Sequence, residues 1–492
     1  MLPPISSTLP VPIFLASSSA LSLFSRLKMP KTMQGWLPKL KKGGGPFYLM
    51  IANAIAEDIA LGRLIAEQRL PTQRKLAQLL GLDFTTVARA YTEAHRRGLV
   101  DAVVGRGTFV SGRRRPHVPH IASGRSSLDL SMNMPPEPDI PELLATMRKD
   151  FVAVGLELRD LMRYQNFCGS EEDRSAGALW LRRRGLTVDA DRLLVVPGAQ
   201  CALLAILTTI ARHGSVVCCE DLTYPGLRAL AHHLGIRLVG LPMDAEGIDA
   251  VAFAAACSQY APVALYCNPT LLNPTTATIS ASRRMALVEV ARHYKVAIIE
   301  DDAYGFLQKD GPAALASIGA DITFYVAGLS KSVGAGLRVA YLAAPDSLMA
   351  SKLSTALRAT TIMGSPITLA LATRWIRDGT ADLMLSAIRK ETNARQKIAV
   401  RILPAGCFSS MPDAFHLWLQ LPGSWSATAF ALHLKKAGIG VVASTAFCVG
   451  IEPPAAVRIC IGGVSTRNEI EQAFIDIRSA LASPPSFTGG IL

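Results

Sequence analysis

Short apolar runs that alternate with helical segments fill most of this chain, and they restrict its possible folds more than any other feature. Such alternation predicts an α/β fold around a mostly parallel sheet, because each parallel strand needs a crossover segment before the next. In these sheets, ligand-binding groups gather at the carboxyl ends of the strands. The expected strands are Arg192–Val196, Ser215–Glu220, Pro262–Cys267, Val296–Asp301 and Thr323–Ala327.

The basic residues of the chain are concentrated near its N-terminus. Residues 1–125 carry nearly all of the net charge of +13, and acids and bases almost balance in the rest. A basic module joined to a neutral body indicates a polyanionic partner, with nucleic acid first among the candidates. Charge alone leaves open that the basic residues only aid solubility.

Three helices and a hairpin are expected between residues 46 and 110, separated by Gly62, Pro71, Gly81 and Gly98. Glycine commonly ends a helix, and proline is tolerated in its first turn. Two helices joined by a short turn let the second one enter a DNA major groove. A plain helical bundle with a hairpin is the alternative, which fits each helix but not the ordered set. The expected elements are the helices Tyr48–Leu61, Thr72–Leu80 and Thr85–Arg97 and the two-stranded wing Leu99–Val110.

The third helix and the wing present the residues that would contact DNA. Thr85, Thr86, Arg89 and Arg96 fall on the solvent face of that helix, and Arg106 falls at the tip of the wing. A cation at such a tip suits a phosphate or a minor-groove contact. The sequence therefore predicts a winged helix that binds double-stranded DNA.

The motifs of this region resemble those of the GntR-type winged helix along its whole length. They are Leu70-Pro71-Thr72-Gln73-Arg74, Leu76-Ala77, Thr86-Val87, Arg89-Ala90-Tyr91 and Gly107-Thr108-Phe109-Val110. The resemblance implies DNA contacts by Arg74, Arg89 and Gly107. One departure concerns the turn, where Asp83 and Phe84 stand in place of the Ser-Arg pair of many members. It puts one expected contact in question and implies an altered operator preference.

The chain is expected to divide into five parts. Residues 1–40 form a tail or include a wrongly assigned start, with Met29 or Met33 as the true initiator. The winged helix spans 41–112, a linker 113–128, the α/β domain 129–485 and a C-terminal tail 486–492. Arg113–Arg115 in the linker either contact the DNA backbone or are simply solvated. The nine cysteines show no metal-ligand spacing and indicate small buried residues in a reducing cytoplasm.

Several loops that follow the expected strands carry residues suited to ligand binding or catalysis. Gly198 stands at a strand-to-helix turn, where backbone N–H groups face an anion. Glu300, Asp301 and Asp302 end an apolar strand and would need a cationic partner if buried. Lys331 follows another strand, and a lysine beside a bound aldehyde forms a Schiff base. Each feature alone is common in proteins, but their order along the chain is not.

That order resembles the fold-type-I pyridoxal-phosphate enzymes of the aspartate-aminotransferase family. The resemblance implies pyridoxal 5'-phosphate as cofactor, a Schiff base on Lys331, and Asp301 as partner of the ring nitrogen. It implies ring stacking by Tyr224 and places Arg458 on the arginine that binds a substrate carboxylate. Thr276 and Gly328 depart from the family pattern and imply weaker phosphate affinity. The remaining implied cofactor contacts are Gly198, Ala199, Gln200, Asn273, Tyr304, Ser330 and Arg338, with Tyr164 reaching the site of a neighbouring subunit.

The two halves together resemble the MocR subfamily of GntR-type regulators. The resemblance implies a head-to-tail homodimer that binds an operator and senses pyridoxal phosphate, or an amino acid or amine, through an aldimine at Lys331. An active pyridoxal-phosphate-dependent aminotransferase with an appended DNA-binding domain is the alternative. No membrane span and no metal site are expected. The effector, the operator and the sign of regulation are not readable from the residues.

Overall fold

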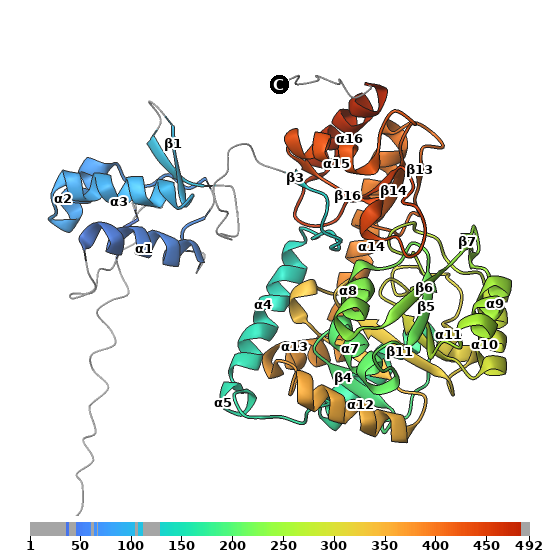
Figure 1. Cartoon of the computed structure of the whole chain (residues 1–492). Coiled ribbons are helices and arrows are strands. Elements are labelled where there is room, and N and C mark those ends of the chain that lie inside the picture. The colour runs from blue at the N-terminus through green and yellow to red at the C-terminus, as the bar shows by residue number, and fades with distance from the viewer. Residues whose placement is uncertain are drawn as a thin grey trace, which may run out of the picture. The chain divides into compact units, whose positions relative to one another are not determined.

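The computed structural model describes residues 36–38, 46–60, 63–65, 67–103, 107–111 and 128–483. The chain divides into two compact units, Met1–Ala122 and Ser123–Leu492, each with a hydrophobic core of its own (Figure 1). The tails, the linker, Gly62 and Arg106 lie outside the described residues. No helix within the described ranges is long and apolar enough to cross a membrane.

The N-terminal unit is a three-helix bundle with an antiparallel hairpin. Its core includes Ile51, Ile55, Leu76, Val87 and Tyr91, and each of these side chains is at most 3% exposed. The apolar spacing seen in the sequence therefore faces inward on all three helices. The elements are α1 (Phe47–Ala60), α2 (Gln73–Leu80), α3 (Phe84–Arg96), β1 (Val100–Val103) and β2 (Gly107–Val110).

The helix starts differ from the expected ones because two side chains act as N-caps. The Thr72 hydroxyl accepts a hydrogen bond from the Lys75 amide, so α2 begins one residue later than predicted. The Asp83 carboxylate accepts one from the Thr85 amide, so α3 begins one residue earlier, at Phe84. Both caps satisfy amides that the first helical turn leaves without partners.

The second unit is built on a seven-stranded sheet of order β4-β12-β11-β10-β9-β5-β6. All its strands are parallel except β12, which is antiparallel to both of its neighbours. The predicted mostly parallel α/β sheet is thus confirmed. The strands are β4 (Leu193–Val196), β5 (Val216–Glu220), β6 (Arg237–Leu241), β9 (Ala264–Cys267), β10 (Ala297–Asp301), β11 (Thr323–Gly328) and β12 (Ala340–Ala343).

Helices cover both faces of this sheet, because its strands are apolar along their whole length. Apolar clusters lie on either side of it. The helices of this region are α4 (Pro141–Gly155), α5 (Leu158–Leu161), α6 (Glu171–Leu181), α7 (Ala199–Ile210), α8 (Pro225–Leu234), α9 (Ala250–Tyr260), α10 (Ala281–Tyr294), α11 (Leu315–Ile318), α12 (Ser347–Thr360) and α13 (Pro366–Arg377). Short segments complete it, namely η1 (Arg182–Arg184), η2 (Ala335–Leu337), β7 (Met243–Asp244) and β8 (Gly247–Ile248).

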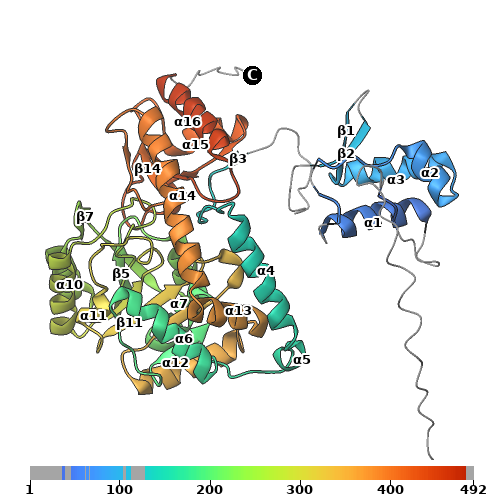
Figure 2. The same cartoon turned by 180° about the vertical axis from the view of Figure 1, so that it is seen from behind.

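A smaller lobe with a sheet of order β13-β14-β17-β16 packs at one end of the unit. The long helix α14 (Thr380–Ile402) runs from beside α13 to this lobe (Figure 2). β3 (Leu128–Asp129), which directly follows the linker, pairs in parallel with β15 (Ile439–Gly440) of the lobe. The other elements are β13 (Phe408–Ser409), β14 (His416–Gln420), α15 (Ala427–Lys436), β16 (Val442–Ala443), η3 (Ser444–Ala446), β17 (Ala456–Cys460) and α16 (Arg467–Ala482).

Candidate functional site

The predicted site residues lie where parallel strands of the large sheet end. β4 leads into Gly198, β5 into Tyr224, β10 ends on Asp301, and β11 leads into Lys331. Because the strands are parallel, these residues emerge at one edge of the sheet. The smaller lobe adds Arg458 from β17. Two segments far apart in the sequence thus contribute to one site.

Lys331 is held by the segment that follows the linker. Its Nζ donates a hydrogen bond to the backbone carbonyl of Asn133. Burial lowers the pKa of Lys331 to about 8, and the neighbouring Arg458 adds to that effect while Asp301 opposes it. A lysine with a pKa near 8 keeps part of its amine neutral at physiological pH, and a neutral amine is the nucleophile for a carbonyl group.

Asp301 is a buried carboxylate without a cationic partner among the residues that the structure describes. Its Oδ2 accepts a hydrogen bond from the Tyr266 hydroxyl at 2.9 Å, whereas its Oδ1 is buried without a partner. Within the described ranges no Lys, Arg or His forms an ion pair with it. Burial raises the pKa of Asp301 to about 6. A protonated ring nitrogen placed at Oδ1 would supply both the missing donor and the missing charge.

The two neighbouring acids already have partners. Asp302 accepts from the Nε of Arg184 at 2.8 Å and from the Tyr325 hydroxyl at 2.7 Å. Glu300 accepts from two backbone amides at the start of α11, at 2.9 and 2.8 Å. Of these three acids, only Asp301 has no described cation or amide on either side-chain oxygen, which makes it the candidate partner of a bound cationic group.

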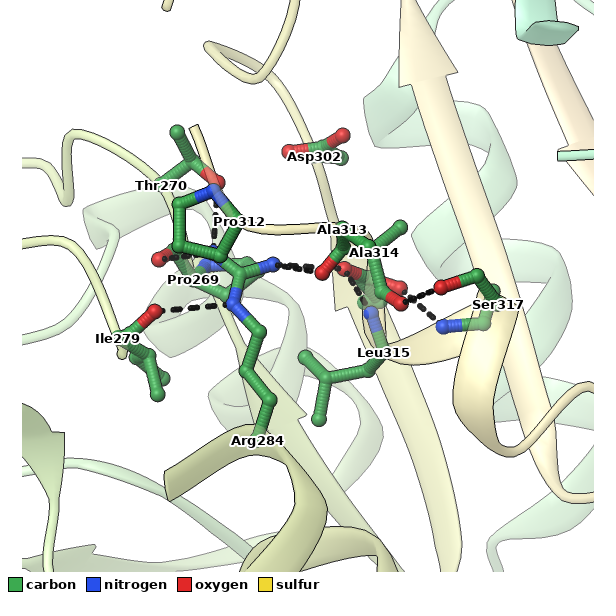
Figure 3. A network of polar contacts seen from close by, with 12 residues as sticks. Pro269, Thr270, Ile279, Arg284, Asp302, Pro312, Ala313, Ala314, Leu315 and Ser317 are labelled. Carbon is green, nitrogen blue, oxygen red and sulfur yellow. Dashed lines mark hydrogen bonds and ion pairs between the residues drawn. The ribbon is translucent and has the colours of Figure 1, made fainter. Parts of the chain in front are cut away.

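The loop that carries Asn273 is fixed by one buried arginine. Arg284 is fully buried and donates to Ile279 O and Pro269 O, both at 2.9 Å, and to Ala313 O at 3.1 Å. Figure 3 shows its guanidinium between these groups, with a further bond to the Thr270 hydroxyl. Buried guanidinium bonds to several carbonyls leave the loop little freedom. The loop that carries Asn273 is therefore fixed on both sides of this residue.

Asn273 and Arg458 contact each other across the two lobes. The Nη1 of Arg458 donates to Asn273 Oδ1 at 2.8 Å, and its Nη2 donates to Ser131 O at 2.5 Å. Arg458 is only 6% exposed, and its buried Nε has no hydrogen-bond partner among the described residues. An unpaired buried guanidinium nitrogen is costly. It leaves a donor for one oxygen of a bound carboxylate.

Tyr304 is a buried residue of the candidate site. Its hydroxyl oxygen accepts a hydrogen bond from Asn133 Nδ2 at 2.7 Å. Its ring packs against Phe415 and His416, with centroid distances of 5.8 and 5.4 Å. Burial raises the pKa of Tyr304 well above its usual value, so the phenol keeps its proton. Protonated Tyr304 can donate to an anionic oxygen in the site.

An anion cradle forms at the start of α7. Gly198 has φ +94°, and a Cβ on it would come within 2.9 Å of the Arg338 guanidinium. Within the described structure, the amides of Ala199 and Gln200 in the first helical turn have no hydrogen-bond partner. Free amides at a helix N-terminus beside an arginine suit a phosphate. Ser330 is partly buried directly before Lys331.

Tyr224 and Tyr164 differ in their placement. Tyr224 is the partly buried N-cap residue directly before α8, and burial raises its pKa, with Asp301 adding to the rise. It therefore lies close to the site. Tyr164 is 79% exposed. Its role in a neighbouring subunit remains a prediction.

The DNA-contact residues predicted in the N-terminal unit are mostly on its surface. Arg74 on α2 and Arg89 on α3 are exposed, and the Arg89 guanidinium lies 4.4 Å from the ring centre of Tyr48. Thr86 is partly buried. The hydroxyl of Thr85 donates to Asp83 Oδ1 at 2.5 Å, and hydrogen bonds from Thr85 lower the pKa of Asp83.

The departure from the family pattern at the turn therefore has a structural effect. Asp83 places a negative charge at the start of α3, which is where a phosphate oxygen would otherwise face the free amides. Gly107 begins β2 with φ +114°, and a Cβ there would come within 3.0 Å of Arg69. Glycine is favoured at that position because other residues rarely adopt such a positive φ.

The sequence interpretation missed several residues of the site. Asn133, Ser131, Tyr266 and Asn268 all hydrogen-bond to predicted site residues or to their backbone. Tyr266 and Asn268 offered a signal, since they are polar groups at the end of an apolar strand. Asn133 offered little, because it lies in an irregular proline-rich segment 198 residues before Lys331.

Two protein families match this chain. The family "Aminotransferase class I and II" matches residues 125–475. The chain belongs to the aminotransferase class I and II family. "Bacterial regulatory proteins, gntR family" matches residues 47–110. With a GntR-type helix-turn-helix ahead of its aminotransferase unit, this family member has the MocR-type architecture that the sequence predicted.

Relatives similar over most of their length are bacterial regulators. The uncharacterized HTH-type transcriptional regulator YdeF of Bacillus subtilis is 28% identical over 449 residues, covering 91% of this chain and 96% of that protein. The vitamin B6 salvage pathway transcriptional repressor PtsJ of Salmonella typhimurium is 28% identical, covering 88% and 97%. The HTH-type transcriptional regulator TauR of Rhodobacter capsulatus is 26% identical, covering 81% and 88%.

Solved structures of aminotransferases share the fold of the second unit. An archaeal alanine:glyoxylate aminotransferase is 22% identical with a TM-score of 0.68, covering 73% of this chain and 91% of that one. The kynurenine aminotransferase of Pyrococcus horikoshii is 20% identical with a TM-score of 0.67 over the same shares. The predicted aspartate-aminotransferase-like fold is thereby confirmed.

Proposed function

We propose that this protein is a DNA-binding transcriptional regulator that holds pyridoxal 5'-phosphate on Lys331 and senses that cofactor or an amino acid or amine bound with it. The observation that carries the proposal is Asp301, a buried carboxylate with a free oxygen and no cation, in the electrostatic range of Lys331. A pyridine ring that is protonated and bound to a lysine matches both groups at once. The relatives that share the whole architecture are named as regulators.

Each part of the cofactor finds groups of suitable chemistry in this site. Asp301 would hold the ring nitrogen, Tyr224 would stack on the ring, and Asn273 and Tyr304 would donate to its phenolic oxygen. Bound in this way, the cofactor supplies an electron-withdrawing aldehyde that captures amines. The phosphate would be held by Gly198, Ala199, Gln200, Ser330 and Arg338, with Tyr164 of a second subunit.

Arg458 would bind the carboxylate of an amino-acid effector. Its unpaired Nε and its Nη2 together form a fork for two carboxylate oxygens. Nη2 is now bonded to the carbonyl of Ser131, so the carboxylate has to displace that carbonyl. An amine without a carboxylate would leave the bond between Arg458 and Ser131 intact. Amino acids and simple amines would thus differ in whether they release Ser131.

The segment Leu130–Pro136 gives the sensor a direct connection toward the DNA-binding unit. It follows the linker by a few residues and contacts Lys331 through Asn133 and Arg458 through Ser131. It is tied to the smaller lobe where the Cys460 amide donates to Leu130 O at 2.8 Å. A cofactor on Lys331 would remove the donor to the Asn133 carbonyl, and a carboxylate on Arg458 would remove the donor to the Ser131 carbonyl.

A homodimer would complete the site and match a two-fold operator. Support comes from a group of exposed apolar side chains on and beside α4 and α5, next to Tyr164. Isolated exposed apolar residues are ordinary, whereas several within one short stretch of chain favour an interface. The set comprises Phe151, Val152, Leu156, Leu158 and Met162, which are 48–85% exposed.

In the DNA-binding unit, Arg74, Thr85, Thr86, Arg89, Arg106 and Gly107 would contact the operator. We place this unit at 41–112 and the aminotransferase-like unit at 129–485, with the linker 113–128 and tails 1–40 and 486–492. A regulator of this kind works where the DNA is, in the cytoplasm.

An active aminotransferase with an appended DNA-binding unit is the second candidate. Lys331, Asp301 and Arg458 favour it, because they meet in one site and transamination needs all three types of group. A panel of amino acids and keto acids with the pyridoxal-phosphate-loaded protein distinguishes the two functions. Repeated turnover at ordinary enzymic rates would refute the pure sensor.

The regulator proposal is tested by DNA binding in the presence and absence of the cofactor. Full-length protein is used to select duplexes from a random library, and the affinity for a selected duplex is measured by fluorescence anisotropy at fixed salt. We expect pyridoxal phosphate, alone or with an amino acid, to change the dissociation constant at least fivefold. An affinity that is equal under all conditions would refute the sensor function.

A further inference from the structure

Asn133 contacts two groups of the proposed cofactor site at once. Its side-chain Nδ2 donates to the Tyr304 hydroxyl oxygen at 2.7 Å, and its backbone carbonyl accepts from Lys331 Nζ. It comes from the irregular segment Leu130–Pro136 and not from the sheet edge that carries the other groups. No motif of the sequence pointed to it.

The contact with Tyr304 decides where the tyrosine proton points. The hydroxyl oxygen already accepts the Asn133 N–H, so one of its lone pairs is occupied. Its ring is enclosed by Phe415 and His416, and no acceptor for its proton is found among the described residues. The proton is therefore free for a group that enters the site.

The orientation of the Asn133 amide matters for this arrangement. If the amide were turned over, its Oδ1 would accept the Tyr304 proton and withdraw it from the site. In the observed orientation, Oδ1 is buried and has no hydrogen-bond partner. A buried amide oxygen without a donor is costly and indicates a partner that arrives with the ligand.

We propose that Asn133 is a positioning residue that directs the Tyr304 hydroxyl at the phenolic oxygen of the bound cofactor, an inference that rests on the proposed function. A hydroxyl aimed in this way stabilises negative charge on that oxygen. The charge in turn sets how firmly the adjoining Schiff-base nitrogen retains its proton. Asn133 thereby links the electronic state of the cofactor to the segment that continues into the linker.

The test is a double-mutant cycle read out by absorption spectroscopy. Full-length protein loaded with pyridoxal phosphate is titrated with acid and base, and the midpoint of the change in its visible absorption is measured. The variants are Asn133→Ala, Tyr304→Phe and the double variant. Met132→Ala is the matched control, because Met132 is the adjacent residue of the same segment and is 59% exposed.

We expect the midpoint to rise in Asn133→Ala by about 0.5 to 1 pH unit, the equivalent of one weakened hydrogen bond. Tyr304→Phe should raise it at least as far. The double variant should match Tyr304→Phe, because Asn133 acts only through that hydroxyl. Met132→Ala should leave the midpoint unchanged. The titratable groups that face Tyr304 and stay constant through the cycle are Asp301, Arg458, Cys460, Tyr224 and His416.

Three results would overturn the inference. They are an unchanged midpoint in Asn133→Ala, shifts that add in the double variant, and an equal shift in Met132→Ala. If Asn133→Ala does not fold or load, Asn133→Ser replaces it, since serine is too short to reach the tyrosine. A wild-type protein with no visible absorption after loading would refute the proposed function itself. Additive shifts with a normal wild-type spectrum refute only the role of Asn133.

Discussion

Asp301 and Asp302 are adjacent buried aspartates, and their neutralisation should have opposite effects on stability. Burial raises the pKa of Asp301 from 3.8 to about 6. At 1.36 kcal/mol per pH unit, the folded protein without cofactor is destabilised by about 3 kcal/mol through this ionised side chain. Asp301→Asn removes the charge, and its amide oxygen can still accept from Tyr266.

We therefore expect Asp301→Asn to raise the free energy of unfolding of the cofactor-free protein by about 2 to 3 kcal/mol at pH 7.5. The direction follows from proton linkage, because between pH 4 and 6 the folded state binds more protons than the unfolded state. The gain should be complete above pH 6, shrink as the pH falls and vanish below pH 4.

Asp302→Asn is the matched control. Asp302 is fully buried and forms an ion pair with Arg184 at 2.8 Å. Its neutralisation leaves a buried guanidinium without its counter-charge, which costs about 3 to 5 kcal/mol. The same chemical change one residue away should thus destabilise the protein strongly.

Pyridoxal phosphate should stabilise the wild type more than Asp301→Asn and so narrow the difference in stability between them. A ligand present at a hundredfold excess over its dissociation constant stabilises the wild type by about 2.7 kcal/mol. The variant would lack the anionic partner that we propose for the ring nitrogen, and we expect its affinity for the cofactor to fall 10- to 100-fold. Its stabilisation at the same concentration should be correspondingly small.

The assay is urea unfolding of the full chain followed by tryptophan fluorescence, with and without cofactor, after bound cofactor has been removed with a carbonyl reagent. Four of the five tryptophans, Trp180, Trp375, Trp418 and Trp425, lie in the second unit and report its unfolding. An Asp301→Asn protein no more stable than wild type at pH 7.5 would refute the reasoning. So would equal stabilisation of the two proteins by the cofactor.

Three further predictions concern the lysine, the DNA-binding unit and the dimer. Lys331→Ala should abolish the visible absorption of bound pyridoxal phosphate, and a borohydride-reducible adduct in the variant would show that another lysine reacts. In the wild type, the rate of cofactor capture should rise about tenfold per pH unit and level off near pH 8, because burial lowers the pKa of Lys331 to about 8. Arg74→Ala should weaken binding to a selected duplex about 10-fold at matched salt, since one cationic contact is lost, and should leave the cofactor absorption unchanged. An unaltered affinity would contradict the assignment of α2 to a DNA-binding helix-turn-helix. If the proposed dimer forms through α4 and α5, Leu156→Asp, at a side chain 85% exposed, should make the protein monomeric in sedimentation analysis, whereas Leu348→Asp on α12, at 67% exposed, should leave it dimeric.

Much of the fold could be predicted because local patterns encode it. The strand-like runs of the second unit are apolar throughout, which requires a sheet covered on both faces, and the observed strands begin or end within two residues of the expected ones. The antiparallel direction of β12 is a different matter. A four-residue apolar strand carries no mark of its direction, which is decided by the loop geometry and the packing around it.

The helix ends show how single side chains override a pattern. Thr72 and Asp83 cap α2 and α3, so both helices begin where a side-chain oxygen meets a free amide and not where the apolar spacing begins. The cap at Asp83 also means that the helix expected to enter the groove starts with an anion. The sequence showed that Asp83 departs from the family pattern, and the structure showed that its carboxylate accepts a hydrogen bond from the Thr85 amide.

The sequence alone determined which chemical groups this protein has and roughly where along the chain they stand. Asp301 and Lys331 were singled out by their places after apolar strands, and the resemblance to fold-type-I enzymes implied the roles of these two residues and of Arg458. Tertiary structure decided how these groups are paired. Within the described part of the chain it left Asp301 without a cation while pairing Arg184 with Asp302, and it brought Asn133 to Lys331 across 198 residues. Such pairings depend on packing between distant segments, and no short-range pattern records them.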